Sequence, residues 1–226
     1  MSDKINIIID ARMVDNNLHG IARYTYEIIN NFNDNQLNLF LLVNDLKLAQ
    51  DIFGEKQHIQ LIEMKSKFLS IFEQVELPWI INRFKGNVLF HTPSFVCSPF
   101  INKPIIMTIH DLNHITLPQY YSKFHVFYYN LIVKTCAKKA KKILTVSYFS
   151  KNEILSWLKC DKDKIKVTYN GIDSRFKVIE NKNQLQDIRK KYNLPQKFVL
   201  YVGNQKKHKN IIDKYFRCGM INISKG

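Results

Sequence analysis

Acidic residues, cysteines and long apolar runs are all scarce in this chain of 226 residues. Only 19 Asp and Glu stand against 34 Lys and Arg, which gives a formal net charge of +15. This excess excludes an acidic surface and favours anionic partners, namely nucleic acid, phosphorylated small molecules or the acidic face of a membrane. No apolar run approaches the roughly 20 residues of a membrane-spanning helix. The N-terminus enters an apolar strand pattern at once, so we expect no signal peptide.

The few cysteines exclude two further classes of protein. Cys97, Cys136, Cys160 and Cys218 are scattered and contain no CxxC spacing. They form neither a disulfide framework nor a zinc site, so we expect reduced thiols in a cytoplasmic protein. An apolar fraction of 46% and an aromatic fraction of 12% support a sizeable buried core.

Strand-like and helix-like segments alternate along most of the chain, as in a parallel sheet covered by helices. The expected strands are short apolar runs, each followed by a polar or small residue: Ile5–Ile9, Leu37–Val43, His58–Met64, Val88–His91, Ile105–His110, Ile143–Val146 and Ile165–Tyr169. The turn pair Asn170-Gly171 closes this series. The sequence therefore predicts an α/β fold with a Rossmann-like parallel sheet.

Helices are expected between these strands. Phe68–Phe84 has a helical pattern that we expect to bend or break near Pro78. Ser122–Lys142 is the longest helical candidate. The next helix begins with a capping-box spacing from Ser150, although Ser147 is an equally good cap.

The end of the chain predicts a second domain that is cut short. The polar, lysine-rich stretch 181–195 contains one short helical pattern and is typical of a connection between domains. Phe198–Val202 then has the pattern of a new strand. We expect an N-terminal domain over 1–176, a connector over 177–196, and the truncated start of a second Rossmann-like domain over 197–226.

Six short strings, in order, resemble the family-4 glycosyltransferases of bacterial cell-surface polysaccharide synthesis. They are Ile9-Asp10-Ala11-Arg12, His19-Gly20-Ile21-Ala22-Arg23-Tyr24, Thr108-Ile109-His110-Asp111-Leu112, Ile143-Leu144-Thr145-Val146-Ser147, Val167-Thr168-Tyr169-Asn170-Gly171-Ile172-Asp173, and Tyr201-Val202-Gly203-Asn204 with Lys209-Asn210. Each string is weak alone, but the six in this order form a specific match. The resemblance implies the two-domain GT-B fold, of which this chain contains the acceptor-side half.

The resemblance also implies an activity and a set of site residues. In the family a hexose moves from a nucleotide sugar, such as GDP-mannose, to a glycan or lipid-linked acceptor, with retention of configuration and without a metal. The catalytic positions would be His110 and Asp111, with His110 facing the transferred sugar. The substrate-binding positions would be Gly20, Arg23, Ser147, Asn170, Gly203 and Lys209, where Gly20 adjoins a phosphate and Lys209 meets the diphosphate.

One departure from the family pattern bears on activity. The family's pair of glutamates at E-x7-E spacing belongs to the donor-binding half, and this sequence has ended before that point. We therefore expect a frameshift or premature stop in a longer gene, and little transferase activity from the 226-residue chain.

Simpler interpretations stand beside these roles. Gly20 alone is typical of a loop, His110 of a hydrogen-bonded strand end, and Ser147 of a helix cap. The spacing of His110 and His114 does not favour a metal site. The lysine stripe 134/138/142 indicates a solvated helix face or contact with an anionic membrane. The six aromatic residues between Tyr120 and Tyr129 are expected to pack in the core.

Two other functions remain open. One is a non-catalytic acceptor domain that binds a glycan or a partner. The other is a basic nucleic-acid-binding protein, although no zinc-finger, helix-turn-helix or RNA-recognition pattern is present.

Overall fold

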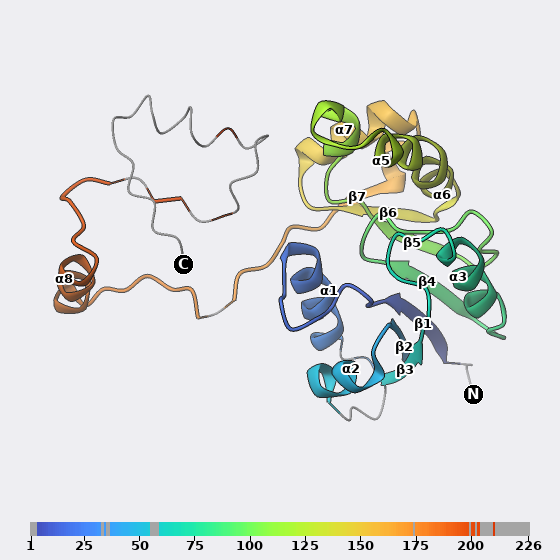
Figure 1. Cartoon of the computed structure of the whole chain (residues 1–226), viewed down its shortest axis with the longest axis horizontal. Helices are drawn as coiled ribbons and strands as arrows, with labels where there is room; N and C mark the ends of the chain where they lie inside the picture. The colour runs from blue at the N-terminus through green and yellow to red at the C-terminus, as the bar shows by residue number, and fades with distance from the viewer. Residues whose placement is uncertain are drawn as a thin grey trace. The chain divides into compact units, whose positions relative to one another are not determined.

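The computed structural model describes residues 4–32, 34, 37–54, 59–173 and 175–198, together with 200, 201, 203 and 210. The chain divides into two compact units, Met1–Asn170 and Gly171–Gly226. All strands of the described residues lie in the first unit (Figure 1). Helix α8 (Lys182–Lys191) belongs to the second unit and confirms the short helix predicted there.

The first unit is built on a seven-stranded sheet in which every pairing is parallel. Its order is β3 (Ile59–Glu63), β2 (Leu37–Val43), β1 (Ile5–Asp10), β4 (Val88–Thr92), β5 (Ile105–Thr108), β6 (Lys142–Thr145) and β7 (Ile165–Val167). The α/β fold with a Rossmann-like parallel sheet is thus confirmed. The chain builds outward from β1 to β3 and then returns to β4, so the strand order reverses between β1 and β4.

Helices cover both faces of this sheet (Figure 1). Helices α1 (Gly20–Asn30) and α2 (Leu46–Phe53) bury Ile29, Ala49 and Phe53 in one core cluster. A second cluster holds α3 (Glu73–Asn82), α5 (Lys123–Tyr128), α6 (Lys134–Lys139) and α7 (Tyr148–Leu158) against the opposite face. Short segments complete the unit: α4 (Asn113–Thr116), η1 (Pro118–Tyr120), η2 (Tyr129–Val133) and η3 (Lys162–Lys164). None of the helices within the described residues has the length and apolar character to cross a membrane.

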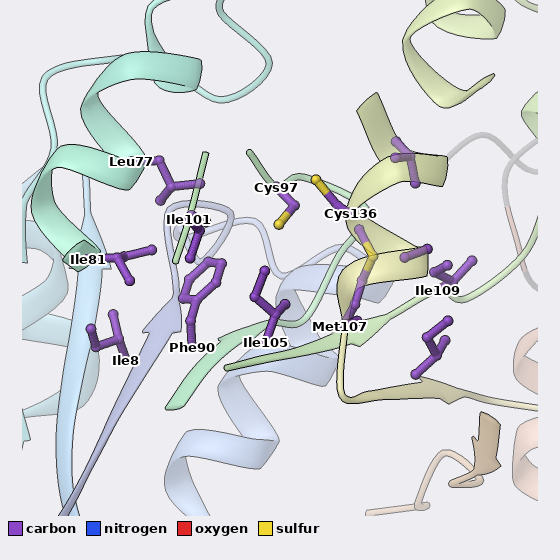
Figure 2. Packing of buried hydrophobic residues seen from close by; sticks show 14 of the residues in the cluster. Ile8, Leu77, Ile81, Phe90, Cys97, Ile101, Ile105, Met107, Ile109 and Cys136 are labelled. Atoms are coloured by element: carbon purple, nitrogen blue, oxygen red, sulfur yellow. The ribbon is translucent and has the colours of Figure 1, made fainter. Parts of the chain in front are cut away.

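The second cluster packs against the central strands of the sheet (Figure 2). Phe90 of β4 is fully buried and lies among Ile8 of β1, Ile105 of β5 and Ile81 of α3. Because strands covered on both faces bury almost every side chain, they read as continuous apolar runs rather than alternating ones. This explains why the sequence pattern identified the central strands.

The expected break near Pro78 is wrong, because α3 runs through this residue without interruption. A proline inside a helix leaves the carbonyl four residues earlier without its donor. Here that carbonyl belongs to Gln74, and the Ser98 hydroxyl donates to it at 3.0 Å. A side chain from the β4–β5 connection therefore replaces the missing backbone hydrogen bond.

The long helix predicted over Ser122–Lys142 ends earlier than expected. It begins with Ser122 as cap and runs through α5, the π-helical segment η2 and α6 to Lys139. Lys142 is the first residue of β6, so it is not part of the lysine stripe on the helix. Val133 and Ala137 are buried, so this side of the helix faces the core.

Two further expectations are corrected. Only part of the aromatic cluster packs in the core: Tyr128 and Tyr129 are buried, whereas Tyr120, Phe124 and Phe127 are exposed. The strand expected over Phe198–Val202 is absent from its described residues 198, 200 and 201.

Candidate functional site at the carboxyl ends of the strands

Four neighbouring strands end in a buried polar residue at the same edge of the sheet. These residues are Asp10 of β1, Thr92 of β4, Thr108 of β5 and Thr145 of β6. Parallel sheets bind ligands outside the carboxyl ends of their strands, where the strand order reverses. In this sheet the reversal lies between β1 and β4, so the candidate site is the loop cluster around these two ends.

His110 follows β5 and reaches back toward this reversal. Its Nε2 lies 2.9 Å from the carbonyl oxygen of Pro93, in the loop after β4. Because a carbonyl only accepts, Nε2 carries the proton, and a neutral ring then leaves an acceptor lone pair on Nδ1. Burial lowers the pKa of His110, against the opposing influence of Pro93 and Asp111. At neutral pH the ring is therefore an acceptor at Nδ1 rather than a cation.

A chain of hydrogen-bonding side chains surrounds the His110 ring. Tyr24 of α1 contacts the ring edge-on, with centroids 4.8 Å apart, and its hydroxyl lies 3.5 Å from the Thr108 hydroxyl. Thr108 also meets Nε2 of His91 at 3.1 Å. Burial, together with the proximity of His110, lowers the pKa of His91 to about 4, so His91 is neutral as well. Tyr24 of α1 and the Pro93 carbonyl after β4 thus hold the His110 ring.

Asp111 lies beside His110 but is engaged with its own loop. Its two carboxylate oxygens accept from the backbone N–H of Asn113 at 3.1 Å and from the Asn113 side-chain amide at 2.9 Å. These bonds shape the start of α4. Next to this loop, an open groove of about 580 Å³ runs between α4 and α7, with Leu112, Glu153 and Trp157 in its lining.

Gly20 and Arg23 lie on the first turn of α1, which follows β1. The helix cap His19 makes no side-chain hydrogen bond, so the first N–H groups are not capped by it. A Cβ at Gly20 would meet no atom within 4 Å, so the fold itself does not require glycine there. Arg23 forms a half-exposed ion pair with Glu27 at 2.7 Å along the same helix.

Ser147 caps α7, which settles the choice between the two serines. Its hydroxyl accepts from the backbone N–H of Ser150 at 3.1 Å and lies 3.0 Å from the Ser150 hydroxyl. Replacing Ser147 by alanine should lower the free energy of unfolding by about 1 kcal/mol, because the cap bond is lost. Urea unfolding measures this. The matched variant Ser156→Ala, outside the cap, should change stability by less than half as much, and equal losses would argue against a capping role.

The remaining predicted positions lie apart from this cluster in the chain. Asn170 is exposed at the end of the first unit. Gly203 belongs to the second unit, where a Cβ would lie 2.7 Å from the Tyr201 hydroxyl. Lys209 lies outside the described residues. Within the part of the chain that the structure describes, no three His, Cys, Asp or Glu residues are grouped to hold a metal ion.

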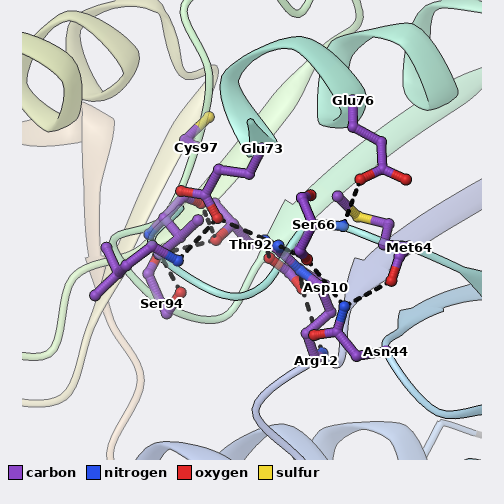
Figure 3. A network of polar contacts seen from close by, with 12 residues as sticks. Asp10, Arg12, Asn44, Met64, Ser66, Glu73, Glu76, Thr92, Ser94 and Cys97 are labelled. Carbon is purple, nitrogen blue, oxygen red and sulfur yellow. Dashed lines mark hydrogen bonds and ion pairs between the residues drawn. The ribbon is translucent and has the colours of Figure 1, made fainter. Parts of the chain in front are cut away.

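Sequence reasoning missed a buried ionic network at the end of β1 (Figure 3). The Arg12 guanidinium donates to both oxygens of Asp10 at 2.8 Å and to a Glu73 oxygen at 3.2 Å. Glu73 also accepts from the Leu69 N–H at 3.0 Å and the Tyr128 hydroxyl at 3.4 Å. Asp10 and Arg12 were noted only as part of a family string, and no local pattern links them to Glu73, which is 61 residues from Arg12.

This network ties together three segments at the strand ends. Arg12 also donates to the Ser66 carbonyl at 3.4 Å, and Glu76 accepts from the Lys65 and Ser66 N–H groups at 2.9 and 2.7 Å. Burial is the main reason why the pKa of Glu73 rises to about 7; the nearby charge of Asp10 adds to it, while Arg12 opposes it. The network therefore shapes the loops beside the site.

Comparisons with known proteins show the family of the chain. The model of Glycosyltransferase Family 4 matches residues 18–176. This chain belongs to glycosyltransferase family 4. The match includes α1, His110 and Ser147 of this family-4 chain, whereas Asp10 and Arg12 at the end of β1 precede it.

Two curated relatives are similar to part of this family-4 chain. The O-antigen chain mannosyltransferase B of Escherichia coli is 30% identical over 134 residues, which is 59% of this chain and 34% of the relative. The O-antigen chain mannosyltransferase RfbU of Salmonella typhimurium strain LT2 is 30% identical over 128 residues, 55% of this chain and 32% of the relative. The matched part thus spans about a third of each relative's length.

A solved structure was also found. The crystal structure of a glycosyltransferase from Rickettsia africae ESF-5 has a TM-score of 0.46 and 19% identity, and the alignment covers 96% of this chain and 58% of that one.

Proposed function

We propose that this chain is the acceptor-side part of a retaining hexosyltransferase that moves mannose from GDP-mannose to a glycan or lipid-linked acceptor. The reaction would serve lipopolysaccharide or other surface polysaccharide synthesis, in the cytoplasm and at the inner face of the membrane. The main support is the family match over residues 18–176, which includes the oriented His110. The names of the two O-antigen mannosyltransferases support the choice of mannose.

In this proposal the strand-end loops act on the sugar. Nδ1 of His110 accepts a hydrogen bond from a hydroxyl of the transferred hexose, while Tyr24 and the Pro93 carbonyl hold the ring. Asp111 shapes the loop that carries His110. The uncapped N–H groups at the start of α1, beside Gly20, meet a phosphate.

The remaining groups would act on the donor and need no metal. Arg23, Ser147, Asn170 and Gly203 contact substrate in this proposal, and Lys209 neutralises the departing diphosphate. In this proposal residues 1–176 form the N-terminal domain, 177–196 the connector, and 197–226 the start of the second domain.

The 226-residue chain should have little transferase activity alone, because it matches only about a third of each relative. Labelled GDP-mannose with lipid-linked acceptors is the direct assay, and UDP-glucose is the matched donor control. Robust turnover would disprove the low activity, and turnover of the control donor alone would disprove mannosyl transfer.

Sugar binding can be tested without turnover. Replacing His110 by alanine should weaken the binding of a mannose-terminated oligosaccharide about tenfold, because one hydrogen bond to the ligand is lost. Titration followed by NMR measures the affinity. Lys162→Ala, in η3 at the opposite edge of the sheet, is the control and should bind as the unmodified chain does. Unchanged affinity in His110→Ala would contradict the role of His110.

A non-catalytic acceptor domain is the second candidate, because the matched region includes only the acceptor side of the family. Oligosaccharide binding without any affinity for GDP-mannose would favour it. Tight, salt-dependent binding to DNA or RNA would instead revive a nucleic-acid-binding role.

A further inference from the structure

One face of the first unit exposes several large apolar side chains. The face is formed by the helix layer that holds α3, α5 and α6, and it includes the loop between β4 and β5. Its apolar members range from 51% exposed for Leu131 to 77% exposed for Ile71: Ile71, Phe72, Val75, Trp79, Phe100, Phe124, Phe127 and Leu131. We call this set the apolar face.

The two helices of the apolar face share one order of residue types along their outer sides, apolar residues first and basic residues after them. In α3 the exposed positions Phe72, Val75 and Trp79 are followed by Arg83, at helical spacing. In the helix from α5 to α6, Phe124, Phe127 and Leu131 are followed by Lys134 and Lys138 at the same kind of spacing. Each helix thus presents apolar side chains first and cations after them.

Both outer sides point away from the sheet, in the same direction. The opposite sides of the helices are buried in one core cluster, with Leu77 and Ile81 from α3 and Val133 and Ala137 from the other helix. The Tyr128 hydroxyl donates to Glu73 at 3.4 Å, which joins the two helices directly. The exposed side chains therefore lie on neighbouring helices of the same layer.

Phe100 lies between the two helices on a backbone held from both sides. The Asn82 side chain at the end of α3 donates to the Phe100 carbonyl at 3.0 Å and accepts from the Asn102 N–H at 2.9 Å. Lys139 at the end of α6 donates to the Pro99 carbonyl at 3.1 Å and also to the Ile101 carbonyl. The loop that replaces a helix between β4 and β5 thus displays Phe100 outward, with 70% exposure.

Basic side chains outnumber acidic ones in the stretch of chain that carries the apolar face. Residues 64–139 contain three acidic side chains, none of them fully exposed: Glu73, Glu76 and Asp111. The same range contains nine basic ones: Lys65, Lys67, Arg83, Lys85, Lys103, Lys123, Lys134, Lys138 and Lys139. The stretch of chain that carries the apolar face is therefore strongly basic, and its two carboxylates outside the core, Glu76 and Asp111, are only partly exposed.

We propose that the apolar face docks this chain on an anionic phospholipid bilayer. Aromatic and aliphatic side chains beside Lys and Arg are suited to the interface, where apolar groups enter the acyl boundary and cations meet the lipid phosphates. A second copy of the chain suits this face less well, because a twofold contact would bring the same cations against one another.

This inference rests on the membrane contact in the proposed function and specifies the surface that makes it. Ile71 and Phe72 lie at the start of α3, and Phe124 near the start of α5. Both helices begin at the carboxyl edge of the sheet, where His110 lies. Docking through the apolar face places that edge near a lipid-linked acceptor.

Flotation of the 226-residue chain with vesicles tests the docking. One set contains phosphatidylcholine alone and the other phosphatidylcholine with phosphatidylglycerol. We expect stronger partition onto the phosphatidylglycerol vesicles, decreasing with added salt. Phe72→Ser combined with Phe127→Ser should reduce partition at least about tenfold, because the variant loses two aromatic rings that enter the bilayer in this proposal. Lys138→Glu should reduce it about fivefold on the anionic vesicles only.

Matched variants on the other side of the sheet complete the experiment. Leu46→Ser and Lys47→Glu alter exposed residues of α2 and should leave partition unchanged. Equal losses in both sets, or no binding of the unmodified chain, would overturn the proposal. So would a dimer in ultracentrifugation that the Phe72→Ser, Phe127→Ser variant abolishes without affecting vesicle partition. Vesicle binding without sugar binding would support this inference and contradict the proposed function.

Discussion

Replacing Arg12 by leucine should lower the free energy of unfolding by about 3–5 kcal/mol, because the change leaves buried carboxylates without their cation. The side chains of Arg12 and Glu73 are fully buried, and that of Asp10 is 2% exposed. Burial opposes the charge on Arg12, but Asp10 and Glu73 together raise the pKa of Arg12, so it stays protonated. Leucine fills part of the volume but donates to neither carboxylate.

Urea unfolding, followed by the fluorescence of Trp79 and Trp157, measures this loss. Arg23→Leu is the matched control, because its ion pair with Glu27 is 40% and 44% exposed and lies on the surface of α1. We expect a change of about 0.5 kcal/mol or less there. If the two leucine variants lose the same stability, the buried network does not hold the fold as argued.

The Arg12 variant should also disturb the candidate site. Arg12 donates to the carbonyl of Ser66, and Glu73 accepts from Leu69 and Tyr128, so the network connects β1, the loop after β3 and two helices. These segments meet at the edge of the sheet where His110 lies. We therefore expect Arg12→Leu to bind the oligosaccharide more weakly. The measurement is made without urea, at a temperature at which the variant is still folded.

The sheet was predictable from the sequence because burial on both faces makes the central strands continuous apolar runs. The position of His110 was predictable too, since it follows such a run and belongs to a family string. The intact helix through Pro78 was not predictable, because the compensating hydroxyl of Ser98 lies 24 residues from Gln74. A local pattern carries no information about such a distant donor.

The aromatic residues near α5 show a second limit. Tyr128 and Tyr129 are buried, whereas Phe124 and Phe127, which precede them in the same helix, are exposed. Composition alone assigned them all to the core. The helical period separates the two sets, but only the packing against α3 and the sheet decides which side faces inward.

Replacing Glu73 by glutamine should remove a pH dependence of stability of about 3 kcal/mol. The pKa of Glu73 is raised from 4.5 to about 7 in the folded chain, chiefly because the carboxylate is buried. Between these values the folded state binds more protons than the unfolded state. Stability therefore falls as the pH rises through this window, and it is retained below it. Glutamine does not titrate, so Glu73→Gln should lack this fall and gain stability relative to the unmodified chain at pH 8.

The geometry permits this substitution without breaking the network. The oxygen that accepts from Arg12 and Leu69 can be the amide oxygen, and the Tyr128 hydroxyl can rotate to accept from the amide nitrogen.

Glu76 provides a control of opposite sign. Burial opposes its charge, but hydrogen bonds from Ser66 and Lys65 outweigh burial and lower the pKa of Glu76. A lowered pKa stabilises the fold above the unfolded value and loses that contribution as the pH falls. Glu76→Gln should therefore be less stable than the unmodified chain at neutral pH, whereas Glu73→Gln is more stable at pH 8. Unfolding curves at pH 5 and pH 8 distinguish the two carboxylates. If both variants changed the free energy of unfolding in the same direction at pH 8, the pKa of Glu73 would not be raised in the folded chain.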